Sequence, residues 1–335
     1  MTRYDVDATN EVDGGSTSCD GPRALLLEPR KVPLGGVRAM DVSRSLPQRD
    51  LPLVGAWCFL DRFGPQEAMM RVDPHPHIGL QTVTWPFVGE VHHRDAVGSD
   101  VFITRGQLNI MTAGDGISHS EYSVGDEPGP IDALQLWIAL PESARRQAAH
   151  FEQHRELPSA RLTPIEGDDP TVTVAVGSFA GVTSPAAVYT PIVGAEISLA
   201  PGSRVRLPFD PSWEHAIVHV DGDLTVHDAS SAGGRDGAIR LHQLDLLYLG
   251  VRRDGIEVST QGGAMIFLLG GEPFEEEIVM WWNFVGRTHE EIAEARQQWE
   301  ARSERFGSVA GHTDAERIPA PPLPNVRLAA RRRRI

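Results

Sequence analysis

Cysteine and long apolar runs are scarce in this 335-residue sequence. Its two cysteines are Cys19, in a polar Gly/Ser segment, and Cys58, in the apolar run at residues 56–60. We therefore expect no structural disulfide and a reducing compartment, with the cytoplasm as the default location. No apolar run approaches the roughly 18 residues that span a bilayer, and the acidic start lacks the layout of a signal peptide. We expect no membrane association.

Basic charge is also in the minority. The chain has 31 lysines and arginines against 46 aspartates and glutamates, a net charge of −15. This balance disfavours a nucleic-acid surface spread over the whole protein. The hydrophobic content of 41% and charged content of 23% are ordinary for a soluble globular protein. A chain of this length exceeds the size at which one core keeps growing, so two domains are expected.

Helical periodicity is nearly absent before residue 141, and short strand-length segments occur in both halves of the chain. Examples are LQTVTWPFV, DVFITR and ALQLWIAL in the first half, and TVTVAVGSFAG, HAIVHVDG and GAMIFLLGG in the second. Such segments, broken by turn formers, favour an all-β barrel or sandwich. We predict one β domain at residues 23–155 and another at 170–307, joined by a breaker-rich connection at 156–169. Residues 142–154 would form a short polar helix or an excursion.

The two ends of the chain differ from this pattern. Residues 1–22 are polar and glycine-rich, which predicts a disordered leader. Residues 308–335 are rich in proline and arginine and predict a flexible tail. The four arginines at 331–334 could contact an anionic partner, but a short basic end on an acidic protein is more often a solvated tail.

One helix is expected near the C-terminus. Thr288 followed by Glu291 is a capping box, and the residues to Arg305 are strong helix formers. Ile292 and Trp299 fall at helical spacing, so that edge should pack on the barrel. Gly307 is a typical stop.

Residues 73–121 contain five of the thirteen histidines. His75 and His77 are one residue apart, and His119 and Glu121 repeat that spacing. Residues i and i+2 of a strand share a face, so each pair can present two donors to one point. The turn formers around both pairs favour a site, although HxH triplets also arise by chance and strand histidines are commonly surface or core residues.

This four-ligand set suits iron, manganese, nickel, copper or zinc better than calcium or magnesium. An octahedral ion would keep two open positions for water, oxygen or a chelating substrate. The same ligands would close a tetrahedral zinc site, so they alone do not separate catalysis from structure.

The other histidines fit this site less well. His92 and His93 are adjacent and face opposite ways on a strand, so at most one can support the cluster and the other would be polar rim. In the second half, His215 and His219 share a strand face, but no second pair follows. We expect no metal there, and both histidines to be solvent-facing or hydrogen-bonded.

The strings HPHIGLQTVTW, GEVHHRDAVG and MTAGDGISHSE resemble the signature of the pirin family of cupins. The resemblance continues through FLDRFGP, LQLWIALP and GGEPFEEEIVMWWNFVGRTHEEI and covers residues 30–307. It implies two tandem cupin domains with one Fe(II) per chain, bound by His75, His77, His119 and Glu121. Gln81 stands where many cupins carry a liganding glutamate, and residues 104–106 (TRG) replace a typical PxG turn.

The resemblance also implies a function, oxygen-dependent opening of a flavonol as in quercetin 2,3-dioxygenases. The metal would polarise the substrate oxygens, and Glu121 is the candidate proton acceptor. The apolar residues Trp85, Phe87, Met111 and Ile117 would line a substrate pocket or pack in the core.

Two alternatives remain, because fold and family do not fix function. One is a non-enzymatic, metal-dependent regulator that binds a transcription factor or a metabolic enzyme, with the acidic run at residues 275–277 as a candidate surface. The other is a storage or structural metal site. The sequence specifies neither the substrate nor the oligomeric state.

Overall fold

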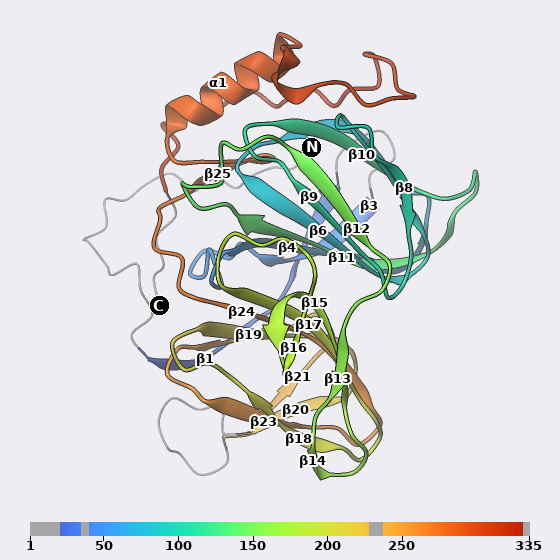
Figure 1. Ribbon diagram of the computed structural model, residues 1–335, viewed down its shortest axis with the longest axis vertical. Helices are drawn as coiled ribbons and strands as arrows, with labels where there is room; N and C mark the ends of the chain where they lie inside the picture. Colours follow the sequence, from blue (N-terminus) through green and yellow to red (C-terminus); the bar gives the residue numbers. More distant parts are fainter. Residues whose placement is uncertain (1–20, 35–39, 228–236, 331–335) are drawn as a thin grey trace.

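The computed structural model describes residues 21–34, 40–227 and 237–330. These residues form two β barrels stacked along the long axis, with the helix α1 (His289–Glu300) lying across one end (Figure 1). The predicted all-β fold with a C-terminal helix is confirmed. Most of the predicted leader, Cys19 and the arginines at 331–334 lie outside the described residues. Cys58 is a buried free thiol.

The N-terminal barrel consists of two sheets. Its strands are β2 (Arg30–Leu34), β3 (Met40–Leu46), β4 (Trp57–Ala68), β5 (Arg71–His77), β6 (Leu80–Val88), β7 (Val91–Asp95), β8 (Asp100–Ile103), β9 (Leu108–Thr112), β10 (Ile117–Ser123), β11 (Gly129–Ala139) and β12 (His150–His154). One sheet has the order β12-β9-β6-β11-β4-β3-β2 and the other the order β5-β10-β7-β8. The smaller sheet carries both metal-ligand motifs.

The C-terminal barrel is built in the same way. Its strands are β1 (Pro22–Leu27), β13 (Ser159–Arg161), β14 (Pro164–Glu166), β15 (Thr171–Phe179), β16 (Val182–Thr183), β17 (Ile192–Leu199), β18 (Arg204–Pro208), β19 (Glu214–Gly222), β20 (Leu224–His227), β21 (Ile239–Leu241), β22 (Leu246–Gly250), β23 (Gly255–Ser259) and β24 (Ala264–Gly271). The sheet orders are β1-β22-β19-β24-β17-β15-β13, with β16 on β15, and β14-β18-β23-β20-β21. The hairpin β25 (Val279–Trp281) and β26 (Phe284–Gly286) leads into α1.

Three segments differ from their predicted structure. β1 pairs with β22 of the C-terminal barrel, because its apolar residues Leu25 and Leu27 pack against a core to which that barrel contributes. The predicted connection contains β13 and β14, which pair with β15 and β18. Residues 142–154 form no helix; their last five residues are β12, paired with β9. In all three cases the strand forms by pairing with another strand, and the pattern within the segment does not specify that partner.

The two barrels share one hydrophobic core. It joins Trp57 and Leu60 of the first barrel to Val218, Tyr248 and Phe267 of the second, all of them buried. Trp57 Nε1 donates to the Val193 carbonyl at 3.1 Å. Such contacts fix the first barrel on the second.

The four residues considered for a pocket lie in cores. Trp85 and Phe87 belong to the core that joins the barrels. Met111 and Ile117 belong to a neighbouring cluster with Trp137. Packing is therefore the observed role of all four.

The C-terminal helix begins as predicted and ends earlier. The Thr288 hydroxyl accepts the Glu291 N–H at 3.2 Å, and the Glu291 carboxylate accepts the N–H of Arg287 at 2.6 Å. Ile292 and Trp299 are buried. The helix stops at Glu300 rather than at Arg305, because Arg302 takes a positive φ of 57°.

The described part of the predicted flexible tail is docked. Trp299 Nε1 donates to the Ile318 carbonyl at 2.9 Å, and the Ile318 N–H donates to the Pro74 carbonyl at 2.9 Å. Arg296 Nε donates to Pro321 O at 2.6 Å. These contacts place residues 308–330 against α1 and the start of the metal-ligand motif, which corrects the flexible-tail prediction for these residues. Among the described residues, no helix has both the length and the apolar character needed to cross a membrane.

Candidate metal centre

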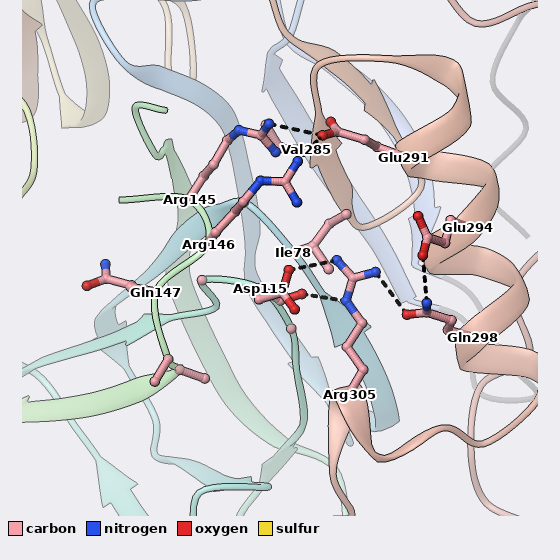
Figure 2. Close-up of a pocket in the computed structure, with 15 residues that line it drawn as sticks. Ile78, Asp115, Arg145, Arg146, Gln147, Val285, Glu291, Glu294, Gln298 and Arg305 are labelled. Carbon is pink, nitrogen blue, oxygen red and sulfur yellow. Dashed lines mark hydrogen bonds and ion pairs between the residues drawn. The ribbon is translucent and has the colours of Figure 1, made fainter. Parts of the chain in front are cut away.

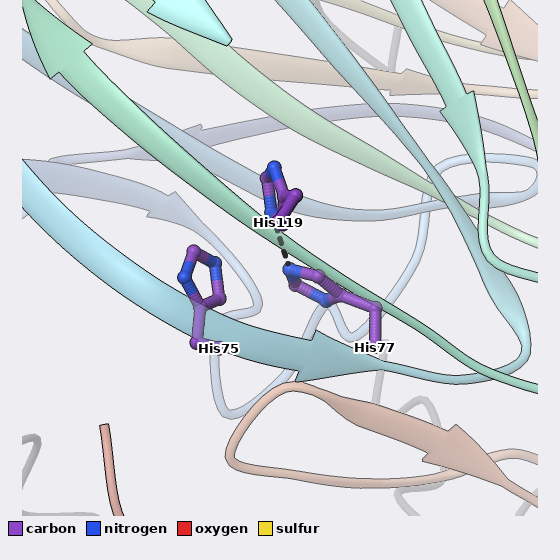
Figure 3. A group of neighbouring side chains, drawn as sticks. All are labelled: His75, His77 and His119. Carbon is purple, nitrogen blue, oxygen red and sulfur yellow. Dashed lines mark hydrogen bonds between the residues drawn. The ribbon is translucent and has the colours of Figure 1, made fainter. Parts of the chain in front are cut away.

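The two predicted ligand pairs lie on neighbouring antiparallel strands. In the β5–β10 pairing, His75 is opposite His119 and His77 is opposite Ile117. Figure 3 shows the imidazoles of His75 and His77 from β5 turned toward His119 on β10. All three rings are buried, and Glu121 is also buried. The period-2 alternation of the strands therefore produces the convergence that the spacing predicted.

The three histidines form one compact donor set, with ligand nitrogens within 4.8 Å of one another. His77 Nε2 and His119 Nε2 are 3.0 Å apart. Glu121 falls in a second set, with His93 and His119, that meets the same limit. The structure thus brings together His75, His77 and His119 and connects Glu121 to them through His119.

Backbone carbonyls fix the proton positions on two of the rings. His75 Nδ1 lies 2.9 Å from the Asp73 carbonyl, and His77 Nδ1 lies 3.1 Å from the Asn283 carbonyl. A carbonyl only accepts hydrogen bonds, so each Nδ1 carries the hydrogen and each Nε2 keeps its lone pair. Such carbonyl contacts are typical of metal-binding histidines.

Burial keeps the rings neutral, which is the form that binds metals. Burial lowers the pKa of His75 to about 4. It also holds the pKa values of His77 and His119 well below their usual range, with the neighbouring His75 as the next cause. At neutral pH the cluster therefore offers uncharged nitrogens.

The spacing of these nitrogens fits one divalent transition metal. Two nitrogens bound at right angles to one ion, each at about 2.1 Å, would be about 3 Å apart. The separation of 3.0 Å between His77 Nε2 and His119 Nε2 matches this arrangement. Imidazole donors also suit iron, nickel, copper and zinc.

The carboxylate of Glu121 is held by Thr84, whose hydroxyl lies 3.2 Å from Glu121 Oε1. Burial raises the pKa of Glu121, and the neighbouring His93 partly offsets that effect. Gln81 does not contribute to either donor set. Its amide donates to Thr112 Oγ1 and to the Ala187 carbonyl, both at 3.0 Å, and thereby bridges the two barrels.

The remaining histidines separate by face. His92 stacks on Phe102 and lies 2.5 Å from an Asp100 oxygen, outside the cluster. His93 points inward beside His119. Alternation alone indicated that these neighbours face opposite ways, but the pairing of β7 with β10 decides which one faces the site.

In the second barrel, His215 and His219 are buried, so the solvent-facing alternative is wrong. His219 Nε2 lies 3.1 Å from the Asp221 carbonyl. The His215 ring stacks on Phe209. Neither residue belongs to the two donor sets.

A cavity of about 570 Å³ separates the N-terminal barrel from α1 (Figure 2). Arg145 and Arg146 pair with Glu291 across it, at 3.0 and 2.6 Å, and Arg305 pairs with Asp115 at 3.2 Å. None of the four predicted ligands lines this cavity. The ion pairs of Glu291 tie α1 to the barrel, and that of Arg305 ties the segment after α1 to it.

Two tandem β barrels, with a histidine-rich donor set between antiparallel strands of the first, define a bicupin. The pirin profile matches residues 39–138, and the profile of the pirin C-terminal cupin domain matches residues 194–307. The chain belongs to the pirin family, as its motifs predicted.

Individual relatives agree with this assignment. A Pseudomonas aeruginosa protein named "Putative quercetin 2,3-dioxygenase" is 42% identical over 299 residues, which cover 88% of this chain and 89% of that one. The crystal structure of a quercetin 2,3-dioxygenase from Acinetobacter baumannii is 36% identical, with a TM-score of 0.82, and covers 92% of this chain and 98% of that one. A bacterial pirin from Escherichia coli in complex with nickel(II) is 17% identical, with a TM-score of 0.56 over 75% of this chain and 99% of that one, a similarity of fold alone.

Proposed function

We propose that this protein is an Fe(II)-dependent dioxygenase that opens a flavonol such as quercetin with molecular oxygen. One iron per chain would bind to His75, His77, His119 and Glu121. The observation that carries the proposal is the convergence of three buried, neutral imidazoles whose ligand nitrogens lie within 4.8 Å of one another. The names of the Pseudomonas and Acinetobacter relatives support the choice of substrate.

Iron, when bound, supplies Lewis-acid polarisation of the adjacent oxygen groups of the substrate. The chain itself orients the donors: the carbonyls of Asp73 and Asn283 hold the rings of His75 and His77. Trp137 packs edge-on against His77, with ring centroids 5.1 Å apart, and keeps water from that side. Rigid rings lower the cost of ordering the site when a ligand binds.

Glu121 has a separate role as the proton acceptor for the acidic hydroxyl of the substrate. It is the one carboxylate in either donor set, and the Thr84 hydroxyl positions its Oε1. A base within hydrogen-bond reach of the reacting hydroxyl is the first requirement for proton transfer.

Oxygen uptake tests the proposed activity. Protein loaded anaerobically with Fe(II) should consume oxygen when quercetin is added. The zinc-loaded protein should not, because zinc has no redox chemistry. An oxygen electrode and the loss of quercetin absorbance measure the reaction, with His77→Ala as the ligand-deficient control. Stoichiometric bound iron without uptake would contradict the dioxygenase proposal and favour the regulatory alternative.

A further inference from the structure

A line of buried side chains continues behind His119. Asp95 Oδ2 lies 3.0 Å from His93 Nε2, and His93 Nδ1 lies 3.4 Å from His119 Nδ1. At the other end, His119 Nε2 faces His77 Nε2 at 3.0 Å. His93, Asp95 and His119 are each at most 2% exposed. The line therefore runs from a carboxylate to the donor set without contact with bulk water.

Asp95 is anchored at the far end of this line. Its Oδ1 accepts the backbone N–H groups of Val97 at 3.0 Å and Ser99 at 2.9 Å. Burial alone would raise the pKa of Asp95, but hydrogen bonds from His93 and Ser99 lower it overall. The carboxylate is therefore ionised and can only accept. Its partner, His93 Nε2, must be the donor.

The proton on His93 Nε2 sets the proton position on His119. His119 can offer the lone pair of Nε2 to a metal beside His77 only if the hydrogen of its ring is on Nδ1. The facing His93 Nδ1, 3.4 Å away, is then the acceptor of that hydrogen. The lone pair of His119 then sits on Nε2 and faces the lone pair on His77 Nε2.

Packing holds the His93 ring in this orientation. The Phe151 ring stacks on it, with ring centroids 4.5 Å apart and an angle of 19° between the ring planes. The strand pairing places His93 opposite Glu121 and Asp95 opposite His119. Both nitrogens of His93 are thus committed, Nε2 to Asp95 and Nδ1 to His119.

We propose that His93 and Asp95 are positioning residues, which fix the tautomer and orientation of His119 for metal binding without binding the metal themselves. This inference rests on the proposed metal centre. His93 belongs to the second donor set, with His119 and Glu121, but on this proposal it supports His119 and is not itself a ligand. Loss of such a supporting partner typically weakens metal binding 10- to 100-fold.

Cobalt(II) titration of the full chain tests the proposal, with affinities from chelator competition and the ligand-field spectrum as a second readout. His93→Phe keeps a ring against Phe151 but removes both hydrogen bonds. We expect its affinity to fall about 10- to 100-fold, with one cobalt still bound at saturation and a changed spectrum. His93→Gln keeps one donor and one acceptor and should recover most of that loss. His92→Phe, on the opposite face, should match the wild type.

The outcomes separate this inference from the proposed function. A His93→Phe protein that loses cobalt completely, as His77→Ala should, would make His93 a ligand and overturn the positioning role. Wild-type affinity and spectrum in His93→Phe would also overturn it. If His93→Phe fails to fold, Asp95→Asn replaces it. We expect this variant to bind cobalt more weakly than the wild type, and an unchanged cobalt affinity would contradict the positioning role. If the wild type binds cobalt tightly and the variants show the expected losses of affinity, but the iron-loaded wild type takes up no oxygen, the dioxygenase proposal is rejected and the positioning role stands.

Discussion

The His77→Ala variant is expected to lose its stoichiometric metal, with an affinity reduced by more than about 100-fold, beyond the effect typical of a supporting residue. His77 is nearly inaccessible, and its Nε2 is 3.0 Å from His119 Nε2 at the centre of the donor set. Removal of the ring takes one of the four proposed ligands from the centre and leaves the compact set of three histidines with only His75 and His119, beside Glu121. His119→Ala should behave in the same way, because His119 belongs to both donor sets.

Elemental analysis after dialysis measures the bound metal, and circular dichroism checks that the strands remain. His92→Ala is the matched control, since His92 stacks on Phe102 outside the site. Full metal occupancy in folded His77→Ala protein would contradict the site assignment.

The Asp132→Ala variant is expected to lower the free energy of unfolding by about 3–5 kcal/mol. Both carboxylate oxygens of Asp132 accept from the Arg62 guanidinium at 2.6 Å. The remaining Arg62 nitrogen donates to the Val220 carbonyl of the second barrel, also at 2.6 Å. Without Asp132, a buried cation between the two barrels would have no counter-charge.

Urea denaturation of the wild type and variant measures this effect. Glu290→Ala removes an equally close but exposed ion pair with Arg327 and should change the free energy of unfolding far less, because water screens that pair. The double variant Arg62→Met and Asp132→Leu should lose much less stability than Asp132→Ala, because no buried charge remains unpaired. A loss below about 1 kcal/mol in Asp132→Ala would show that water or other groups solvate Arg62.

The candidate ligands could be predicted because their spacing is a local property of strands. His75 and His77 share a face through the period of the backbone, as do His119 and Glu121. Which of His92 and His93 faces the metal centre could not be predicted from the local sequence. It depends on the pairing of β7 with β10, which places His93 opposite Glu121. Sequence alternation shows that two neighbours face apart but not which one faces inward.

The errors in the fold also arose from long-range contacts. β1 joins β22 across more than half the chain, and no periodicity in either segment specifies that partner. The docked tail is held by hydrogen bonds from Arg296 and Trp299 to its backbone carbonyls and by apolar packing, with Ala320 buried and Leu323 and Leu328 against the core around α1. These apolar residues stand among prolines without the period of a strand or a helix, so the segment appeared free in the sequence.

Anomalous diffraction at the iron edge, from crystals of anaerobically iron-loaded protein, tests the central claim most directly. We predict one anomalous peak per chain, enclosed by His75, His77, His119 and Glu121, with His93 hydrogen-bonded to His119 and not bound to the metal. A peak bound by His93 and remote from His75 and His77, or no peak in protein incubated with excess iron, would contradict the account.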